Sequence, residues 1–223
     1  MIGNVKLYFF ILNMKKFAMM LAAGVVALGA SAQAADVQSV TYAVITVPVA
    51  AGNNFIGVSV APIDGTADTF ADILGVDGTT PVKLYSGSGY TDTTAGQVTA
   101  DPGTAVYYDA GSASTIYEVG VAQTATASVS LNTGFTLVAN PFAEGWAPSA
   151  TSLSAGSNKR YGANANKIHV WNGTGWTTVW FKTGTGWQVY GGGDMPSIGA
   201  GQAVLIEKGG ANTATAVTFT AAQ

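Results

Sequence analysis

Hydrophobic and polar residues alternate along most of the chain, which is the pattern of half-buried β-strands. The alternation is clearest in residues 168–181, where two β-prone runs flank Asn172-Gly173. Asn-Gly between two such runs is the strongest short-range hairpin signal. If Asn172 pairs with Gly175, the hairpin has one core face and one face of tryptophans. The core face would carry Ile168, Val170, Thr177, Val179 and Phe181, and the opposite face His169, Trp171, Trp176, Thr178 and Trp180.

Other runs along the chain predict further strands. They cover residues 37–49, 55–60, 82–85, 90–92, 105–108, 115–121 and 214–221. Residues 69–74, followed by Gly75, fit a single helical turn. Pro48 cannot donate to a strand ladder, so the first strand should lie at a sheet edge or end there. After the N-terminal region, no run is long and periodic enough for a substantial helix, and we predict an all-β fold.

Three blocks of sequence recur in the same order. Residues 52–58 match 132–138, residues 82–90 match 168–176, and residues 102–107 match 200–205, at offsets of 80, 86 and 98 positions. We interpret them as two copies of one antiparallel β unit, in residues 35–127 and 128–223, with a join near residues 122–130. The two copies would form either one or two β-sandwich or barrel-like domains.

The N-terminus has the organisation of a secretory signal peptide. Lys15 and Lys16 precede an apolar run to Gly29, and Ala32-Gln33-Ala34 forms a small-residue cleavage site. We therefore expect residues 1–34 to be removed, with Met14 as an alternative start. The rival interpretation is a retained anchor, but polar residues divide the run into pieces shorter than the roughly 20 residues of a membrane span. We expect no transmembrane span after processing.

Composition and charge agree with an exported protein. Only 9% of the 223 residues are charged and none is cysteine, so disulfides and thiolate metal sites are excluded. Residues 35–127 carry nine acidic residues against one lysine, a formal charge of −8, whereas residues 128–223 carry five basic against three acidic residues, +2. This division fits either solvated surface charge or complementarity between copies. A pI near 4.9 argues against nucleic-acid binding.

The sequence predicts no catalytic, cofactor or metal site. Asp64, Asp68, Asp72 and Asp77 are spaced by 4, 4 and 5 positions, which does not match a calcium loop and favours capping around the helical turn. His169 is the single histidine, which excludes a multi-histidine site, and no Gly-x-Ser-x-Gly nucleophile motif is present. We expect His169 to be a polar strand residue and the protein not to be an enzyme.

Aromatic side chains are the main candidates for binding. Trp and Tyr suit both burial at protein interfaces and stacking on sugar rings. The alternative is a face covered within the chain by Trp187, Tyr190 and the loop at Trp146. The candidate interface or ligand-stacking residues are Trp171, Trp176, Trp180, Trp187, Tyr85 and Tyr90.

The first and last strands, both β-prone, would either complete their own sheets or be donated to a neighbour. The candidate residues for strand donation are Val37, Val40, Tyr42 and Val44.

Residues 134–141 (GFTLVANP), 168–173 (IHVWNG), Trp187 and 198–203 (IGAGQA) resemble a loosely defined group of exported bacterial β-proteins. The group shares a G-x-N-L-I-x-N-P strand, an I-x-x-W-(N/D)-G hairpin and an I-x-x-G-x-A closing strand. This chain departs in having Phe135-Thr136 where Asn-Leu is common, and Ala61-Pro62 where the first copy would need Asn-Pro. The resemblance implies a secreted surface or extracellular structural protein without a catalytic motif.

We therefore expect a secreted bacterial protein, extracellular or on the cell surface, that has no enzymatic activity and assembles with itself into a filament or surface layer. Strand donation is one route to that assembly. The alternative function is a carbohydrate-binding module that presents its aromatic face to an extracellular polysaccharide.

Overall fold

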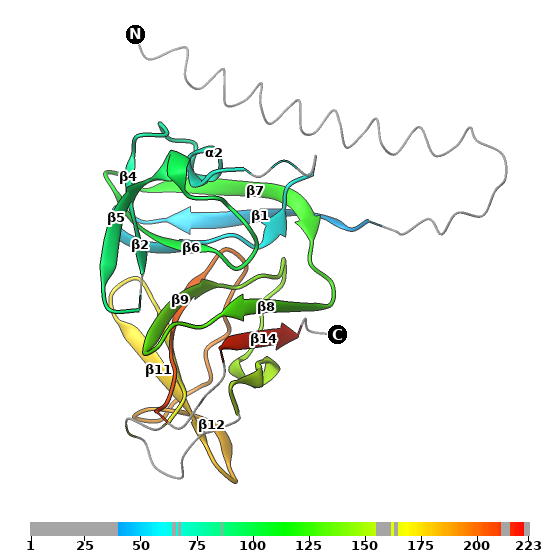
Figure 1. The fold of residues 1–223 in the computed structure, drawn as a ribbon, viewed down its shortest axis with the longest axis vertical. Coiled ribbons are helices and arrows are strands. Elements are labelled where there is room, and N and C mark those ends of the chain that lie inside the picture. Colours follow the sequence, from blue (N-terminus) through cyan, green and yellow to red (C-terminus); the bar gives the residue numbers. More distant parts are fainter. Residues whose placement is uncertain are drawn as a thin grey trace, which may run out of the picture. The chain divides into compact units, whose positions relative to one another are not determined.

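The computed structural model describes residues 40–63, 66, 68–85, 87–154, 162, 165–210 and 215–220. These residues form 14 strands in four antiparallel sheets, with one short α-helix (Figure 1), so the prediction of an all-β, sandwich-like fold is confirmed. The expected signal peptide and Val37 lie outside the described residues. Among those residues, no helix has the length and apolar character needed to cross a bilayer.

Strands β1 to β7 come from the first half of the chain. Strand β1 pairs with β7 and β7 with β3, while β2, β6, β4 and β5 form a second sheet in that order. The bounds are β1 (Tyr42–Val49), β2 (Gly52–Gly57), β3 (Val60–Ala61), α2 (Phe70–Leu74), β4 (Pro81–Tyr85), β5 (Tyr90–Thr94), η1 (Ala95–Gln97), β6 (Ala105–Ala110) and β7 (Ser114–Ala122).

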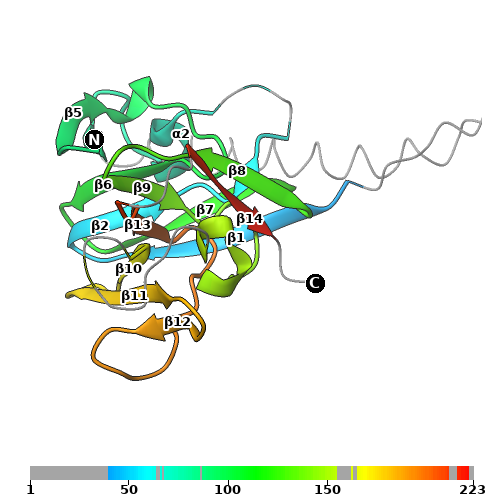
Figure 2. The same ribbon diagram turned by 60° about the horizontal axis from the view of Figure 1, so that its bottom comes forward.

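The second half repeats this arrangement with β12 added and without a described strand equivalent to β3. Strand β14 pairs with β8, and the larger sheet has the order β12-β11-β10-β13-β9 (Figures 1 and 2). The bounds are β8 (Thr126–Ser130), β9 (Phe135–Ala139), η2 (Pro148–Ala150), η3 (Ser152–Ser154), β10 (Lys167–Trp171), β11 (Trp176–Lys182), β12 (Gly186–Val189), β13 (Ala203–Glu207) and β14 (Ala216–Thr220). The expected division after residue 127 falls inside β8, which begins at Thr126.

Cross-strand register gives the residue equivalences between the two repeats. Gly57 lies opposite Ala105 in the first sheet, and Ala139 lies opposite Ala203 in the second. Because Ala105 and Ala203 are 98 positions apart, Gly57 corresponds to Ala139, an offset of 82 rather than the 80 expected from sequence. The other two predicted offsets, 86 and 98, agree with the register of the hairpins and closing strands.

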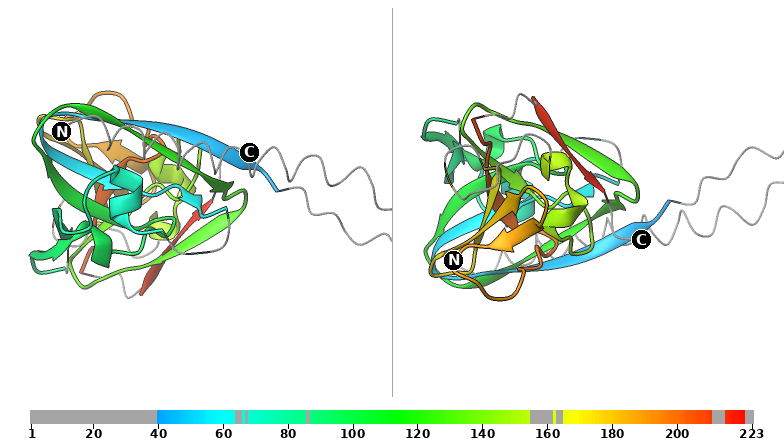
Figure 3. Two further views of the ribbon diagram at one scale, coloured as in Figure 1. Left: turned by 90° about the horizontal axis from the view of Figure 1, so that it is seen from above. Right: turned by 90° about the horizontal axis from the view of Figure 1, so that it is seen from below.

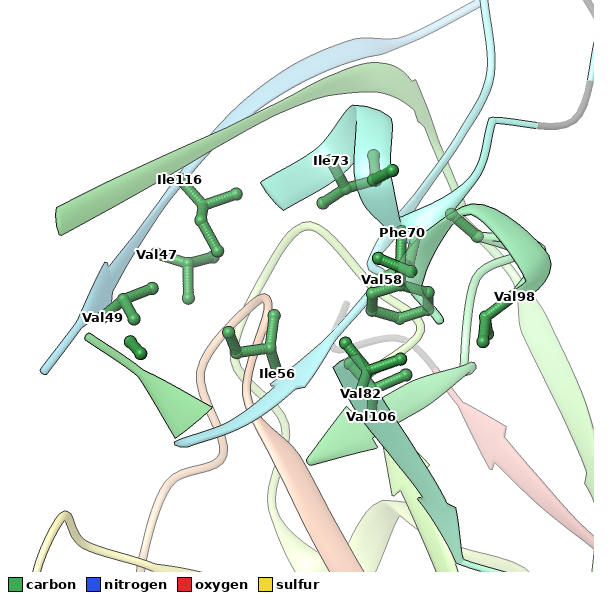
Figure 4. Close-up of a cluster of buried hydrophobic side chains, with 14 of the residues drawn as sticks. Val47, Val49, Ile56, Val58, Phe70, Ile73, Val82, Val98, Val106 and Ile116 are labelled. Carbon is green, nitrogen blue, oxygen red and sulfur yellow. The ribbon is translucent and has the colours of Figure 1, made fainter. Parts of the chain in front are cut away.

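Each repeat packs a two-stranded ribbon, β1–β7 or β8–β14, against its sheet. In the first repeat the alternation of β1 buries Ile45, Val47 and Val49 on Ile56 and Val106 of the sheet (Figure 4). In the second, the ribbon residues Val217 and Phe219 pack in one cluster with the sheet residues Ile168, Val179 and Ile206. Each buried side chain of this size stabilises the fold by roughly 1.5–3 kcal/mol relative to an exposed one. Both cores therefore depend on the alternation of buried and exposed residues in their ribbons.

The predicted helical turn is confirmed as α2. Thr69 and Asp72 form a capping box at its start, and Gly75 ends it in the left-handed conformation, with φ 64°. Phe70 has no exposed surface and fills the first core beneath the turn (Figure 4). The turn therefore closes the side of the first sandwich.

The repeats meet where Gly57 and Ala139 approach each other. A Cβ atom on Gly57 would lie 2.1 Å from the Ala139 Cβ, so only glycine fits there. The Gly57 amide donates to the Gly201 carbonyl and the Ala139 amide to the Gly103 carbonyl, both at 2.9 Å. These equivalent bonds cross between the repeats, and the described residues from Tyr42 onward form one compact unit.

The predicted hairpin register is confirmed between β10 and β11. Trp171 lies opposite Trp176 and Ile168 opposite Val179, and both Ile168 and Val179 are fully buried. At the turn, the Asn172 amide donates to the Gly175 carbonyl at 3.0 Å, and the Gly175 amide donates to the Asn172 side-chain oxygen at 2.8 Å. That oxygen also accepts from the amide and hydroxyl of Thr174. Asn172 therefore closes the turn through its side chain.

Replacing Gly173 with valine should destabilise the protein by about 1–3 kcal/mol, because its φ of 96° strains any residue with a Cβ. Gly175→Val is the matched control, since Gly175 also has open space around its Cα but is not among the glycines with positive φ. Urea denaturation of both variants measures the difference. Equal midpoints would show that backbone strain at Gly173 does not matter.

Candidate functional site

Aromatic side chains from both repeats gather where the two larger sheets face each other. The centre of the contact is small and apolar, with Ala105, Ala139 and Ala203 in one cluster with Leu137. Around it lie rings from β2, β4, β5 and β6 of the first repeat and β9, β10 and β11 of the second. We call this set the aromatic collar; it consists of Phe55, Tyr85, Tyr90, Tyr107, Phe135, His169, Trp171 and Trp176.

The collar closes on itself through successive ring contacts. The closed path crosses between the repeats at Phe55 on Trp176, with ring centroids 4.8 Å apart, and at Tyr85 on Phe135, at 6.3 Å. Within the first repeat the path runs from Phe55 through Tyr107 and Tyr90 to Tyr85. Within the second it runs from Phe135 through His169 to Trp176. Tilted and edge-on pairs of this kind stabilise by about 0.5–1.5 kcal/mol beyond the area they bury.

The first repeat covers the tryptophan face of the hairpin. The sequence offered Trp187, Tyr190 and the loop at Trp146 as the internal cover, and this was wrong for Trp187 and Trp146. Phe55 contacts both Trp171 and Trp176, whereas Trp146 is buried in the second core beside Phe219. Trp171 is half-buried and Trp176 is 38% exposed, so the first repeat covers only part of the tryptophan face.

The six predicted aromatic residues do not form one surface. Trp171, Trp176, Tyr85 and Tyr90 belong to the collar. Trp180 lies on the same face further along β11, beside Lys167 and Gln188. Trp187 lies on the opposite face, because it pairs with Phe181 and packs against the second core. Phe55 and Tyr107 were not expected here, since the sequence does not show which strand faces the hairpin.

His169 lies in a row of polar side chains across three strands. Its Nδ1 is 2.8 Å from the Thr178 hydroxyl on β11, and its Nε2 is 3.1 Å from a Glu207 carboxylate oxygen on β13. Glu207 also pairs with Lys167 at 2.5 Å. Burial lowers the pKa of His169 below its ordinary value, and the Glu207 carboxylate opposes that effect.

The hydroxyl, imidazole and carboxylate have the composition of a catalytic triad, but their setting favours a structural role. His169 lies directly opposite Thr178 in the ladder, so the contacts join neighbouring strands of one sheet. Neither of the two grooves described next is lined by these three residues.

Two grooves lie at the joint between the repeats, and they are equivalent. The larger, about 580 Å³, lies between β1 and β2 of the first repeat and the β10–β11 hairpin of the second. The smaller, about 320 Å³, exchanges the roles of the repeats. Corresponding lining residues are Val47 and Val129, Trp171 and Tyr85, and Gly201 and Gly103.

Side chains suited to hydrogen bonding in the larger groove are engaged within the chain. Asn54 bonds to the backbone of Ala50 and Gly52, and the Gln202 amide bonds to Gly199 and Trp171. The groove therefore presents mainly apolar surface and backbone.

The outer face of the β1–β7 ribbon is the largest group of exposed apolar side chains in the described residues. Val44 is 58% exposed and Tyr117 51% exposed, and Tyr42, on the same face of β1, is 39% exposed. Seen from above and below, β1 runs along the outer margin (Figure 3). Of the residues proposed for strand donation, Tyr42 and Val44 lie on this face, and Val40, 50% exposed, precedes β1. Strand β1 itself pairs with β7 over eight residues. Tyr117 was missed because only the β1–β7 register places it beside the first strand.

Two of the four acidic residues around α2, Asp72 and Asp77, cap local backbone groups as predicted. Asp72 accepts from the Thr69 amide and hydroxyl, and Asp77 accepts from those of Thr79. Asp64 lies outside the described residues. Among the residues that are described, no group of three or more His, Cys, Asp or Glu is placed to hold a metal ion.

Comparison with known proteins gives no match to a family model, to a curated protein or to a solved structure.

A double-mutant cycle between Phe55 and Trp176 should give a coupling energy of about 0.5–1.5 kcal/mol, because these rings join the two repeats. Both residues are changed to alanine, singly and together, and unfolding free energies are compared. The same cycle between Phe55 and Trp187 is the control and should give no coupling, since Trp187 lies on the other side of its sheet. Independent behaviour of Phe55 and Trp176 would contradict the collar.

NMR titration of His169, the single histidine, should show an imidazole pKa below the ordinary 6.5. Its contribution to folding is then present above pH 6.5 and lost as the pH falls through the lowered pKa. Glu207→Gln should lower the pKa further, and Lys167→Gln should raise it, because the two charges act in opposite directions. Shifts of the same sign in both variants would contradict this arrangement.

Proposed function

We propose that the protein is a secreted, non-enzymatic structural protein of bacteria that assembles with itself into an extracellular filament or surface layer. The contact surface is the outer face of the β1–β7 ribbon. One observation carries this proposal: the two equivalent ribbons have the same strand pairing, but only the first has an apolar outer face.

Register defines which outer residues correspond. Val44 pairs with Val119 in the first ribbon, and the equivalent pair in the second is Thr126 with Thr220. The next outward pair is Thr46 with Tyr117, which corresponds to Ser128 with Thr218. Since the second ribbon forms with threonine and serine at these positions, the ribbon does not need apolar residues there. Exposed apolar side chains that the fold does not require are typical of interaction surfaces.

A second copy of the chain is the partner that this face fits best. The face carries no charged side chain, because the only charged residue of either strand, Glu118, points inward. Two such faces can meet without repulsion between like charges, and each would bury the other's tyrosine and valine side chains. Because both copies use the same surface, this isologous contact joins only two copies. A continuous polymer needs a second contact through a different surface.

The partly exposed rings of the collar supply candidates for that further contact. Tyr90 is 46% exposed and Trp176 is 38% exposed, and both were among the residues expected from sequence. Association through faces replaces strand donation in this proposal, because donating β1 would break its eight cross-strand pairs with β7.

Carbohydrate binding is less well supported. Trp171 lines the larger groove, as a sugar platform would require, but it also contacts Phe55 within the collar. The amides of Asn54 and Gln202 are occupied, so few side-chain partners remain for sugar hydroxyls.

Copying the second ribbon onto the first should abolish assembly without unfolding the protein. The variant is Val44→Thr, Tyr117→Thr and Val119→Thr combined, since threonine suits a strand and occupies the equivalent positions. Sedimentation velocity should show monomers, and circular dichroism an unchanged fold.

The reverse graft, Thr126→Val, Thr218→Tyr and Thr220→Val, is the matched variant and should increase association. Wild-type protein that remains monomeric at high concentration would contradict the proposal, as would undiminished assembly of the threonine variant. A pull-down with insoluble polysaccharide tests the alternative function on the same proteins.

A further inference from the structure

Glu118 is a carboxyl group enclosed beneath the β1–β7 ribbon. It has no exposed surface, and its Oε2 accepts a hydrogen bond of 3.0 Å from the Ser59 amide. Its Oε1 is buried and has no hydrogen-bond partner among the described residues. A buried charge in this position is costly, because one amide is its only partner.

The group lies where the ribbon meets the second repeat. The Ser59 hydroxyl donates to the Asn140 carbonyl at 2.6 Å and accepts from the Gly201 amide at 2.7 Å. A Cβ atom on Gly201 would lie 2.1 Å from a Val47 methyl and 3.3 Å from the Glu118 Oε1. The carboxyl therefore touches both the loop of the second repeat and the serine that joins the repeats.

The second repeat shows that the fold does not need a carboxyl here. Glu118 pairs with Ile45, and the equivalent pair is Ala127 with Phe219. Phe219 is fully buried and packs on Trp146 at 5.2 Å between ring centroids. An apolar side chain thus serves the same position in the same architecture.

No described charge compensates Glu118. Of the elements packed on it, β1 carries only Tyr42, which points outward, and α2 carries only Asp72, whose carboxylate caps Thr69. Strand β3, residues 58–59 and the loop 199–202 have no titratable side chain. Burial raises the pKa of Glu118 from its ordinary 4.5 to about 7, against the opposing effect of the Ser59 hydrogen bond.

We propose that Glu118 is a pH-dependent latch: the neutral carboxyl holds the β1–β7 ribbon against Ser59 and Gly201, and its ionisation loosens the ribbon and weakens assembly. The part concerning assembly rests on the proposed function. Since the folded-state pKa is raised, the stabilisation is complete below pH 4.5 and is lost as the pH rises to about 7.

Hydrogen exchange of the ribbon amides tests the latch in the monomer. After correction for intrinsic exchange, opening of β1–β7 should increase by up to about tenfold per pH unit between about pH 5 and 7, the limit for release of one proton. The β8–β14 amides are the internal reference and should show no such increase. Glu118→Gln should remove the dependence, and Glu118→Leu serves the same purpose if the buried amide prevents folding.

Asp92→Asn is the matched control, because Asp92 is an exposed carboxylate, 86% accessible, and its loss should leave the dependence unchanged. A pH dependence that persists in Glu118→Gln and Glu118→Leu would overturn the latch. So would ribbon opening that does not change with pH in the wild type.

Sedimentation velocity of the same proteins separates this inference from the proposed function. Wild-type assembly should fall between about pH 5 and 8, and Glu118→Gln should assemble equally at both. Assembly that is independent of pH in the wild type would overturn the regulatory part. Expected exchange behaviour in a protein that never assembles would support the latch and refute the proposed function.

Discussion

The close approach of Gly57 and Ala139 is the constraint on which the arrangement of the two repeats depends. Packed sheets usually lie about 10 Å apart, and only very small residues allow a backbone contact between them. Here a single added methyl group would lie 2.1 Å from its neighbour. At this spacing the amides of both residues reach the opposite repeat, and the rings of the collar meet around the centre. The position of each repeat relative to the other therefore depends on this one close contact.

Local features were predictable from the sequence because they depend on neighbouring residues. The register of Trp171 with Trp176 follows from the turn between them, and α2 follows from Thr69, Asp72 and Gly75. The offset of the first block was wrong by two positions, but a shift of two keeps every side chain on its predicted face. In the 168–181 hairpin, period-two alternation likewise placed Ile168, Val170 and Val179 on the core face.

The cover of the tryptophan face was not predictable in the same way. It depends on Phe55, which is more than a hundred residues from Trp171 in the chain and carries no signal of its partner. The same holds for Tyr117, which joins the exposed ribbon face only through its pairing with Thr46. In the sequence, nothing distinguishes Glu118 from the other acidic residues. Its burial depends on Ser59 and Gly201, which come from two other parts of the chain.

Because the two repeats have the same architecture, each one shows which residues the other needs for folding. Where both carry similar residues, as at Val47 and Val129, the architecture accounts for the choice. Where they differ, as at Val44 and Thr126, the fold accepts either residue and the difference needs another cause.

The edge of β1 gives further evidence on why the outer residues of the two ribbons differ. Pro48 lies in β1 without an amide hydrogen, so it weakens addition of another strand along that edge. The outer face of the ribbon carries no charged side chain that would oppose contact. In the self-assembly that we propose, contact through this face would leave every cross-strand pair of β1 and β7 in place.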